Sequence, residues 1–205
     1  MKKDTVTYTV IFTFVVCMFF VFFLSLANEL TRERVAANRR FAERSAVLKA
    51  LGIPFDSPDK VDTLYTSGIR TVKSGDTELY GATVGGASRF AKRFSGSALW
   101  GTVTGVLAVD AAVERIAGLE IVSHNETPGL GGRIDESWFK DQFKGERIGP
   151  KGIRVRQGSG KGDTDRENGE LDAVTGASRT SQSMEDIINA ELAALRAVRD
   201  AGGLK

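Results

Sequence analysis

The chain has 205 residues, with 28 Lys and Arg against 26 Asp and Glu, so its formal net charge is +2. A balance this even creates no strong field toward polyanions, and we expect no nucleic-acid partner. The single cysteine, Cys17, and the single histidine, His124, exclude an intramolecular disulfide, a Cys/His zinc site and a Cys-x-x-Cys redox pair, and we expect no metal site.

The first predicted element is an uncharged run of 24 residues from Thr5 to Asn28. It contains six phenylalanines and is long enough to cross the ~30 Å hydrocarbon core of a bilayer as a helix. A cleaved signal peptide and a buried core helix are the alternatives, but the apolar region of a signal peptide has about 7–15 residues and no clear small-x-small cleavage site follows Leu24. We interpret residues 1–28 as a retained anchor, with residues 5–28 in the membrane.

The charges beside this run leave its orientation open. Lys2 and Lys3 precede it, whereas four arginines follow it within the next twelve residues. Under the positive-inside rule this count places the C-terminal side in the cytoplasm.

Residues 29–52 contain helix-forming residues with apolar side chains at helical spacing, and this pattern ends at Gly52, just before Pro54. We predict a juxtamembrane helix that continues from the anchor. Beyond the anchor, residues 29–205 are enough for one well-cored domain and hardly for two, and we assign residues 53–205 to that domain.

The middle of the chain is strand-like. Residues 69–73 lead to the turn signal Ser74-Gly75-Asp76, and Leu79-Tyr80 follows, which predicts a hairpin. Two longer runs rich in β-branched residues, 99–109 and 116–122, flank a short turn and predict two buried strands at the centre of a sheet.

Residues 157–170 combine glycines and charges with no large apolar side chain, which predicts a mobile surface loop. From Ser181 onward, apolar side chains recur at steps of three and four, so we predict a helix that packs one face on the sheet and stops at Gly202-Gly203. The fold class is therefore α+β: one N-terminal transmembrane helix, then a single domain with a central sheet and flanking helices.

Residues 172–181, which lead into the last helix, are rich in small and hydroxyl-bearing side chains. At a helix N-terminus the unpaired N–H groups and the helix dipole favour a phosphate. Simple N-capping by Thr180 or Ser181, without a ligand, is the alternative, and capping statistics alone favour it. A second glycine-rich segment, from Gly158, lacks the Walker spacing and is followed by no apolar helix, so we assign it to solvent.

Three segments, in this order behind an N-terminal anchor, carry a resemblance to a known family. They are residues 96–101 (Gly-Ser-Ala-Leu-Trp-Gly), 124–132 (His-Asn-Glu-Thr-Pro-Gly-Leu-Gly-Gly) and 172–178 (Asp-Ala-Val-Thr-Gly-Ala-Ser). The chain resembles the covalent FMN-binding subunit of the Rnf ion-translocating electron transport complex, known as its G subunit, and the related C subunit of the Na⁺-translocating NADH:quinone oxidoreductase. Similar Gly-Ala-hydroxyl sequences at Thr83 and Ser88 lack the aspartate that Ser178 has six residues earlier, at Asp172.

The resemblance implies that a flavin transferase links FMN through a phosphoester to Ser178, where the family usually has threonine. It further implies cofactor-binding roles for Asp172, Thr175, Gly176, Ala177 and Thr180 near the attachment point, and for Glu126, Thr127, Leu130 and Gly131 along the flavin ring.

The residues themselves allow such a ring site and leave alternatives open. The proline and glycines of residues 126–131 permit a flat ring to approach the backbone, with Leu130 as an apolar face, although an ordinary tight turn is the alternative. Trp100 is a second candidate for ring contact or else a core aromatic. His124 is a candidate proton partner for reduced flavin or else a turn-stabilising residue.

The resemblance implies an electron-carrier subunit of a membrane redox complex, coupled there to Na⁺ or H⁺ movement. The partners would be the other subunits of that complex, and the protein would be a single-pass protein of the inner membrane with its domain on the periplasmic side. We expect no catalytic residue, because the cofactor supplies the chemistry. Two alternatives remain: a membrane-tethered FMN-binding module that serves another reductase or regulator, and a non-redox anchor or assembly protein.

Overall fold

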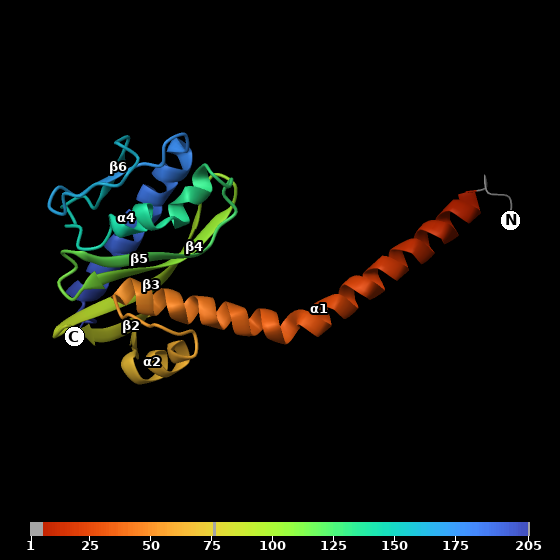
Figure 1. The fold of residues 1–205 in the computed structure, drawn as a ribbon, viewed down its shortest axis with the longest axis horizontal. Helices are drawn as coiled ribbons and strands as arrows, with labels where there is room; N and C mark the ends of the chain where they lie inside the picture. Colours follow the sequence, from red (N-terminus) through yellow and green to blue (C-terminus); the bar gives the residue numbers. More distant parts are fainter. Residues whose placement is uncertain (1–5, 76, 205) are drawn as a thin grey trace. The chain divides into compact units, whose positions relative to one another are not determined.

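The computed structural model describes residues 6–75 and 77–204. The chain forms two compact units that divide between Phe41 and Ala42. The first unit contains most of helix α1, and the second contains the end of α1 and all the described strands (Figure 1).

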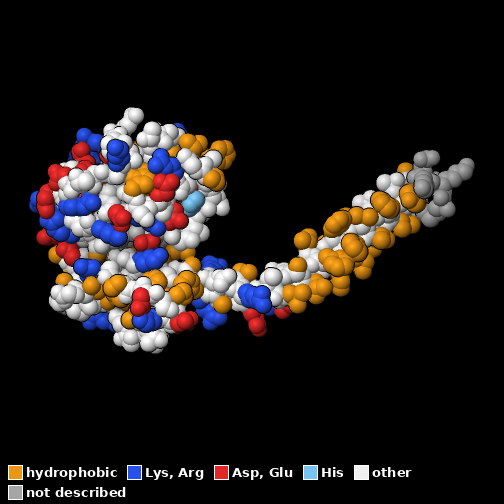
Figure 2. All heavy atoms as spheres, in the orientation of Figure 1, with side chains coloured by type: hydrophobic (Ala, Val, Ile, Leu, Met, Phe, Trp, Pro, Cys, Tyr) orange, Lys and Arg blue, Asp and Glu red, His pale blue; other side chains and the backbone are white. Residues whose placement is uncertain are grey.

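Helix α1 runs from Val6 to Leu51. An 18-residue window within it has a mean hydropathy of 2.8 and none of that window is buried, so α1 is long and apolar enough to cross a membrane. Figure 2 shows apolar side chains crowded along this part of the helix. The alternative of a buried core helix is therefore wrong for the apolar stretch, and the helix predicted over residues 29–52 is present as the continuation of α1.

Five strands form one antiparallel sheet in which each strand pairs with the next along the chain. They are β1 (Arg70–Ser74), β2 (Thr77–Val84), β3 (Ala87–Ser97), β4 (Thr102–Asp110) and β5 (Ile116–Ser123). The predicted hairpin is β1 and β2, and the predicted central pair is β4 and β5. Strand β3 has no counterpart among the predicted elements.

Both faces of the sheet are covered. On one face, Leu107 and Val109 of β4 join the core that includes the apolar side of the C-terminal helix. On the other face, Val106 and Ala108 pack with the last turns of α1. Gly118 of β5 permits this close approach, because a Cβ atom there would lie 2.5 Å from the carbonyl oxygen of Ala50. Burial on both faces explains why β4 is a continuous apolar run in the sequence.

Shorter elements and one long helix complete the second unit. They are α2 (Lys60–Gly68), the 3-10 helix η1 (Gly131–Asp135), α3 (Ser137–Asp141), the parallel pair β6 (Arg154–Arg156) and β7 (Glu170–Asp172), and α4 (Ser178–Asp200). The fold is α+β, as predicted, with a sheet and flanking helices (Figure 1).

Helix α4 confirms the predicted C-terminal helix and begins three residues earlier than expected, at Ser178. Its buried side is the predicted apolar stripe, which includes Met184, Ile188 and Leu192. The helix ends at Asp200, and Gly202 has a positive φ of 77°, the conformation expected after a helix C-terminus.

Candidate functional site

Three large apolar side chains are exposed on the folded unit. Outside α1, the exposed large hydrophobic residues among those described are Leu99, Trp100 and Leu130, at 47%, 67% and 46% of their full exposure. Leu99 and Trp100 were expected inside a buried strand, and this expectation is wrong because β4 begins only at Thr102. The loop before β4 is closed by a bond from the Ala98 N–H to the Gly101 carbonyl, which leaves both side chains in solvent.

A buried carboxylate joins this loop to two other segments. Glu126 is only 4% exposed. Its Oε1 accepts the backbone N–H of Trp100 at 2.8 Å, and its Oε2 accepts the hydroxyl of Thr180 at 2.6 Å. The loop that carries Trp100, the segment 124–132 and the first turn of α4 therefore meet at one side chain.

Gly131 is required by this arrangement. A Cβ atom at this position would lie 2.6 Å from Thr180 Oγ1 and 2.7 Å from Glu126 Oε2, closer than real Cβ contacts permit. Leu130, the residue before Gly131, lies near the segment 172–178, since a Cβ atom on Gly176 would be 3.4 Å from Leu130 Cδ2. The apolar side chain of Leu130 and the Thr-Gly-Ala-Ser sequence are thus neighbours.

The structure exposes Ser178 and buries Thr180. Ser178 is the first residue of α4, and it is exposed, as are Thr175 and Gly176. Ala177 is buried, at 7% exposure, and caps the helix without a side-chain hydrogen bond. Only Ser178 thus presents an accessible hydroxyl at the start of the helix.

The alternative of N-capping by Thr180 or Ser181 is wrong. Both hydroxyls are buried in the first turn and are engaged elsewhere: Thr180 bonds Glu126, and Ser181 Oγ accepts the N–H of Val174 at 3.0 Å. The leading N–H groups of α4 therefore have no side-chain cap, and they remain available to an acceptor outside the chain.

Asp172 binds the glycine-rich loop. Its Oδ2 accepts the hydroxyl of Ser159 at 2.8 Å and the N–H of Gly160 at 3.1 Å. Its backbone is held in turn by Gln142, which is 1% exposed and bonds both its N–H (2.7 Å) and its carbonyl (3.0 Å). Residues 157–169 of the predicted loop form no helix or strand, whereas Glu170 begins β7. The loop is attached at defined points, and neither Gln142 nor Ser159 has a sequence signal of this role.

Segment 124–132 closes on itself. The carbonyl of Thr127 accepts the N–H groups of Leu130 (3.1 Å) and Gly132 (3.0 Å), and His124 Nδ1 accepts the N–H of Glu126 at 3.2 Å. Thr127 therefore supports the turn through its backbone, while its side chain is exposed. The turn-stabilising interpretation of His124 agrees with this bond.

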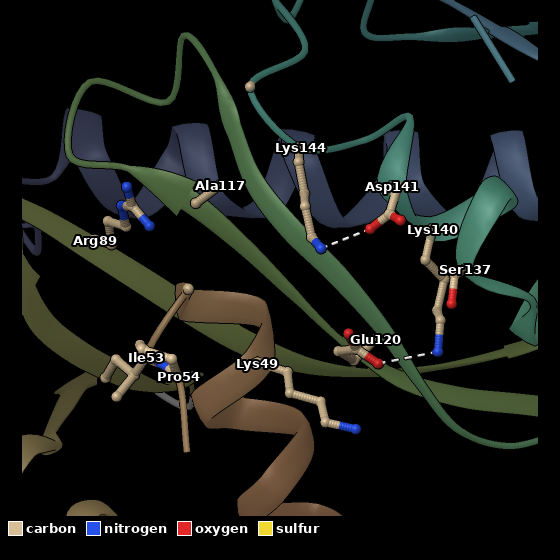
Figure 3. Close-up of a pocket in the computed structure, with 12 residues that line it drawn as sticks. Lys49, Ile53, Pro54, Arg89, Ala117, Glu120, Ser137, Lys140, Asp141 and Lys144 are labelled. Atoms are coloured by element: carbon tan, nitrogen blue, oxygen red, sulfur yellow. Dashed lines mark hydrogen bonds and ion pairs between the residues drawn. The ribbon is translucent and has the colours of Figure 1, made fainter. Parts of the chain in front are cut away.

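A cavity of about 690 Å³ lies elsewhere, at the end of α1 beside β5 and α3. It is lined with charge pairs (Figure 3): Lys140 Nζ contacts Glu120 at 3.1 Å, and Lys144 Nζ contacts Asp141 at 2.6 Å. Burial opposes the charge of Lys140, but Asp135 and Glu120 outweigh it and raise the pKa of this amine. None of the residues predicted to bind flavin lines this cavity.

Comparisons with known proteins identify the family of the chain. Residues 98–193 match the model of the FMN-binding domain family, a range that includes all the candidate residues. The chain is 31% identical to the G subunit of the ion-translocating oxidoreductase complex of Cereibacter sphaeroides, over 81% of this chain and 73% of that protein. The chain belongs to the family of G subunits of ion-translocating oxidoreductase complexes.

The chain is also similar to a second group of proteins. The chain is 29% identical to the C subunit of the Na⁺-translocating NADH-quinone reductase of Pseudomonas aeruginosa, over 46% of this chain but only 38% of that protein. The crystal structure of the C subunit from Parabacteroides distasonis superimposes with a TM-score of 0.69 at 22% identity, covering 82% of this chain and 96% of that one. The latter likeness shows the fold. The apolar helix and the G-subunit relatives together support a membrane-anchored subunit of a redox complex.

Proposed function

We propose that this chain is the electron-carrier subunit of a membrane-bound ion-translocating oxidoreductase complex, and that it carries FMN attached by a phosphoester to Ser178. The observation that supports this proposal most is the exposure of three apolar side chains, Leu99, Trp100 and Leu130. Glu126 joins the segments that carry them to helix α4, which begins with the exposed Ser178. Exposed apolar side chains that gather at one place mark a surface that another group covers. A planar isoalloxazine has the apolar faces to do so.

The residues at the start of α4 fit the phosphate end of the cofactor. Ser178 Oγ supplies the ester oxygen, and a flavin transferase is the partner that forms the bond. The new O–P bond replaces the phosphoanhydride P–O bond of an activated FMN donor, and the hydroxyl proton leaves with the displaced group. The uncapped N–H groups of the first turn and the positive end of the helix dipole stabilise the negative charge of the resulting phosphodiester. A serine offers a hydroxyl oxygen for the same ester as the usual threonine, without the threonine methyl group.

The ring end of the cofactor fits the other two segments. Leu130 and the Trp100 indole are exposed on neighbouring segments and offer apolar surface against which a ring can lie, excluding water from its faces. When bound, FMN supplies the capacity to accept and release electrons. The contribution of this chain is attachment, orientation and electrostatics.

The proposal extends to the partners and to the orientation in the membrane. The partners would be the remaining subunits of the complex, and the domain would lie on the periplasmic side of the inner membrane, with α1 as its single span. A protease-protection assay on spheroplasts tests the orientation: we expect digestion of the domain together with a periplasmic marker, and survival of the domain would place it in the cytoplasm.

Attachment is tested by intact mass and in-gel flavin fluorescence of the full chain, co-expressed with a flavin transferase. We expect wild type and Ser178→Thr to gain the mass of one FMN and Ser178→Ala to gain none. Ser183→Ala, a serine further along the same helix, is the matched control and should gain the FMN. Wild type without bound flavin, under conditions that flavinylate a threonine-bearing relative, would refute the proposal, and flavin that is present but released on denaturation would refute the covalent link.

A further inference from the structure

The buried carboxylate of Glu126 has no cationic partner among the described contacts. Its two oxygens accept hydrogen bonds from two neutral donors, the Trp100 N–H and the Thr180 hydroxyl. Burying a carboxylate without an ion pair is costly compared with a neutral amide or an apolar side chain. Stability alone therefore gives no reason for a glutamate at this position.

The two donors belong to the two ends of the proposed cofactor site. Trp100 is in the loop that offers apolar surface to the ring, and Thr180 is two residues beyond the attachment hydroxyl of Ser178. Trp100 precedes Glu126 by 26 residues and Thr180 follows it by 54, so no local structure brings the three together. Only the carboxylate joins these segments through side-chain hydrogen bonds among the described contacts.

The two hydrogen bonds of Glu126, which we call the bridge, hold the Trp100 loop through its backbone and make no bond to the Trp100 side chain. Because the bond is made to the N–H of Trp100, the indole is free to point into solvent, where it is 67% exposed. Gly131 completes the arrangement, because any side chain there would collide with the bridge, and Leu130 precedes it directly. A single carboxylate thus fixes the spacing between Trp100, Leu130 and the first turn of α4.

We propose that Glu126 is a positioning residue for the flavin ring: its carboxylate holds the Trp100 loop to Thr180 and so fixes the ring-binding surface relative to the attachment hydroxyl. This inference rests on the proposed function. It assigns Glu126 and Thr180 to the scaffold of the site and not to direct contact with flavin. It also puts a negative charge close to the ring, which opposes the charge added when a reductant such as dithionite delivers two electrons and one proton to the flavin.

The bridge itself is tested in the flavin-free full chain in detergent, by a double-mutant cycle of Glu126→Ala and Thr180→Val followed by denaturant unfolding. If the two side chains bond, the double variant is more stable than the sum of the single changes predicts, by about tenfold in the unfolding equilibrium constant. Additive effects would overturn the bridge. This measurement does not depend on flavin.

The positioning role is tested in the flavinylated chain. In Glu126→Ala we expect FMN still attached at Ser178, but with fluorescence raised several-fold and anisotropy lowered, because the ring is no longer held against Trp100. Thr180→Ser, which keeps the hydroxyl, should retain the wild-type signal, whereas Thr180→Val should behave as Glu126→Ala does. Glu146→Gln alters the other buried glutamate, which bonds a backbone N–H at a different place, and serves as the matched control.

Glu126→Gln separates charge from geometry. The amide oxygen can accept the Trp100 N–H and its NH₂ can donate to the Thr180 hydroxyl, so the ring should stay in place. Loss of the charge should raise the two-electron midpoint potential, and a tenfold change in the reduction equilibrium corresponds to about 30 mV. Wild-type fluorescence and potential in Glu126→Ala would overturn the inference while the proposed function stands; wild type without flavin would overturn the proposed function itself.

Discussion

Two glycine-containing segments of the domain, residues 124–132 and 157–170, differ in charge and are held in different ways. The first closes through its own backbone, because the Thr127 carbonyl accepts two N–H groups. Its buried carboxylate, Glu126, bonds neighbouring elements instead of its own segment. The second has internal bonds to the side chains of Asp163 and Asp165, and it is also attached by outside groups that include Gln142, Glu146 and Asp172. Glycine in the first segment makes room for a bridge, whereas the second segment relies on the side chains that bind it.

The largest expected effect comes from breaking the first segment. Gly131→Ala should destabilise the domain by about 2–3 kcal/mol, because its Cβ would collide with both Thr180 and Glu126. Denaturant unfolding of the full chain in detergent measures this effect. Gly129→Ala is the control: nothing lies within 4 Å of its Cβ, so only the strain of its positive φ of 75° remains, about 1 kcal/mol. Equal losses in the two variants would contradict the steric argument.

An intermediate effect is expected where the second segment is attached. Asp172→Ala removes the acceptor for Ser159 and Gly160, which should cost about 1–2 kcal/mol and open the loop to limited proteolysis near residues 157–162. Ser159→Ala removes one of these two bonds and should give a smaller effect in the same direction. Cleavage rates of the wild type and the two variants, compared under native conditions, measure it. Unchanged cleavage in Asp172→Ala would show that this carboxylate does not hold the loop.

The smallest effect concerns the pH dependence that Glu146 gives to the stability of the folded chain. Burial is the main cause that raises the pKa of this carboxyl above its ordinary value of 4.5, although the Gly169 N–H and Arg166 lower it in part. The folded state therefore favours the protonated form. Its contribution to stability is present below pH 4.5 and is lost as the pH rises through the raised value.

Glu146→Gln should remove this dependence. The amide oxygen can still accept the N–H of Gly169, and the buried charge is gone, together with its long contact of 3.9 Å from Oε2 to Arg166 Nη1. We expect a gain of up to about 1 kcal/mol at pH 7 relative to wild type and a smaller gain at pH 4. Melting temperatures of both proteins at the two pH values measure the difference, and an equal gain at both would contradict the argument.

The sequence predicted those elements whose pattern is local. The period of α4, the turn at Ser74-Gly75 and the continuous apolar run of β4 each show in the sequence, because burial of one helix face, a hairpin turn and burial on both strand faces have direct signatures. Strand β3 has none, because its charged side chains are paired by distant elements. Lys92 contacts Glu191 of α4, and Arg93 contacts Glu43 of α1.

The same limit applies to the candidate site. Motif resemblance singled out Glu126 and Thr180 separately, each as a flavin contact, and the bond between them appears only in the folded chain, 54 positions apart. The exposure of Trp100 could not be predicted from the sequence either, because β4 begins three residues after the start of the apolar run. The motif resemblance predicts which residues form the site, whereas the contacts that these residues make depend on their tertiary partners.

The last turns of α1 have a practical consequence for removing the membrane segment. Residues from Ser45 to Leu51 are largely buried, with Leu48 and Leu51 fully so, and they cover one face of the sheet. A soluble fragment cut at residue 53 would uncover that face and aggregate, whereas one that begins at or before Ala42 keeps it covered. The helix that anchors this protein is also, over its final ten residues, an inseparable part of the folded unit that it anchors.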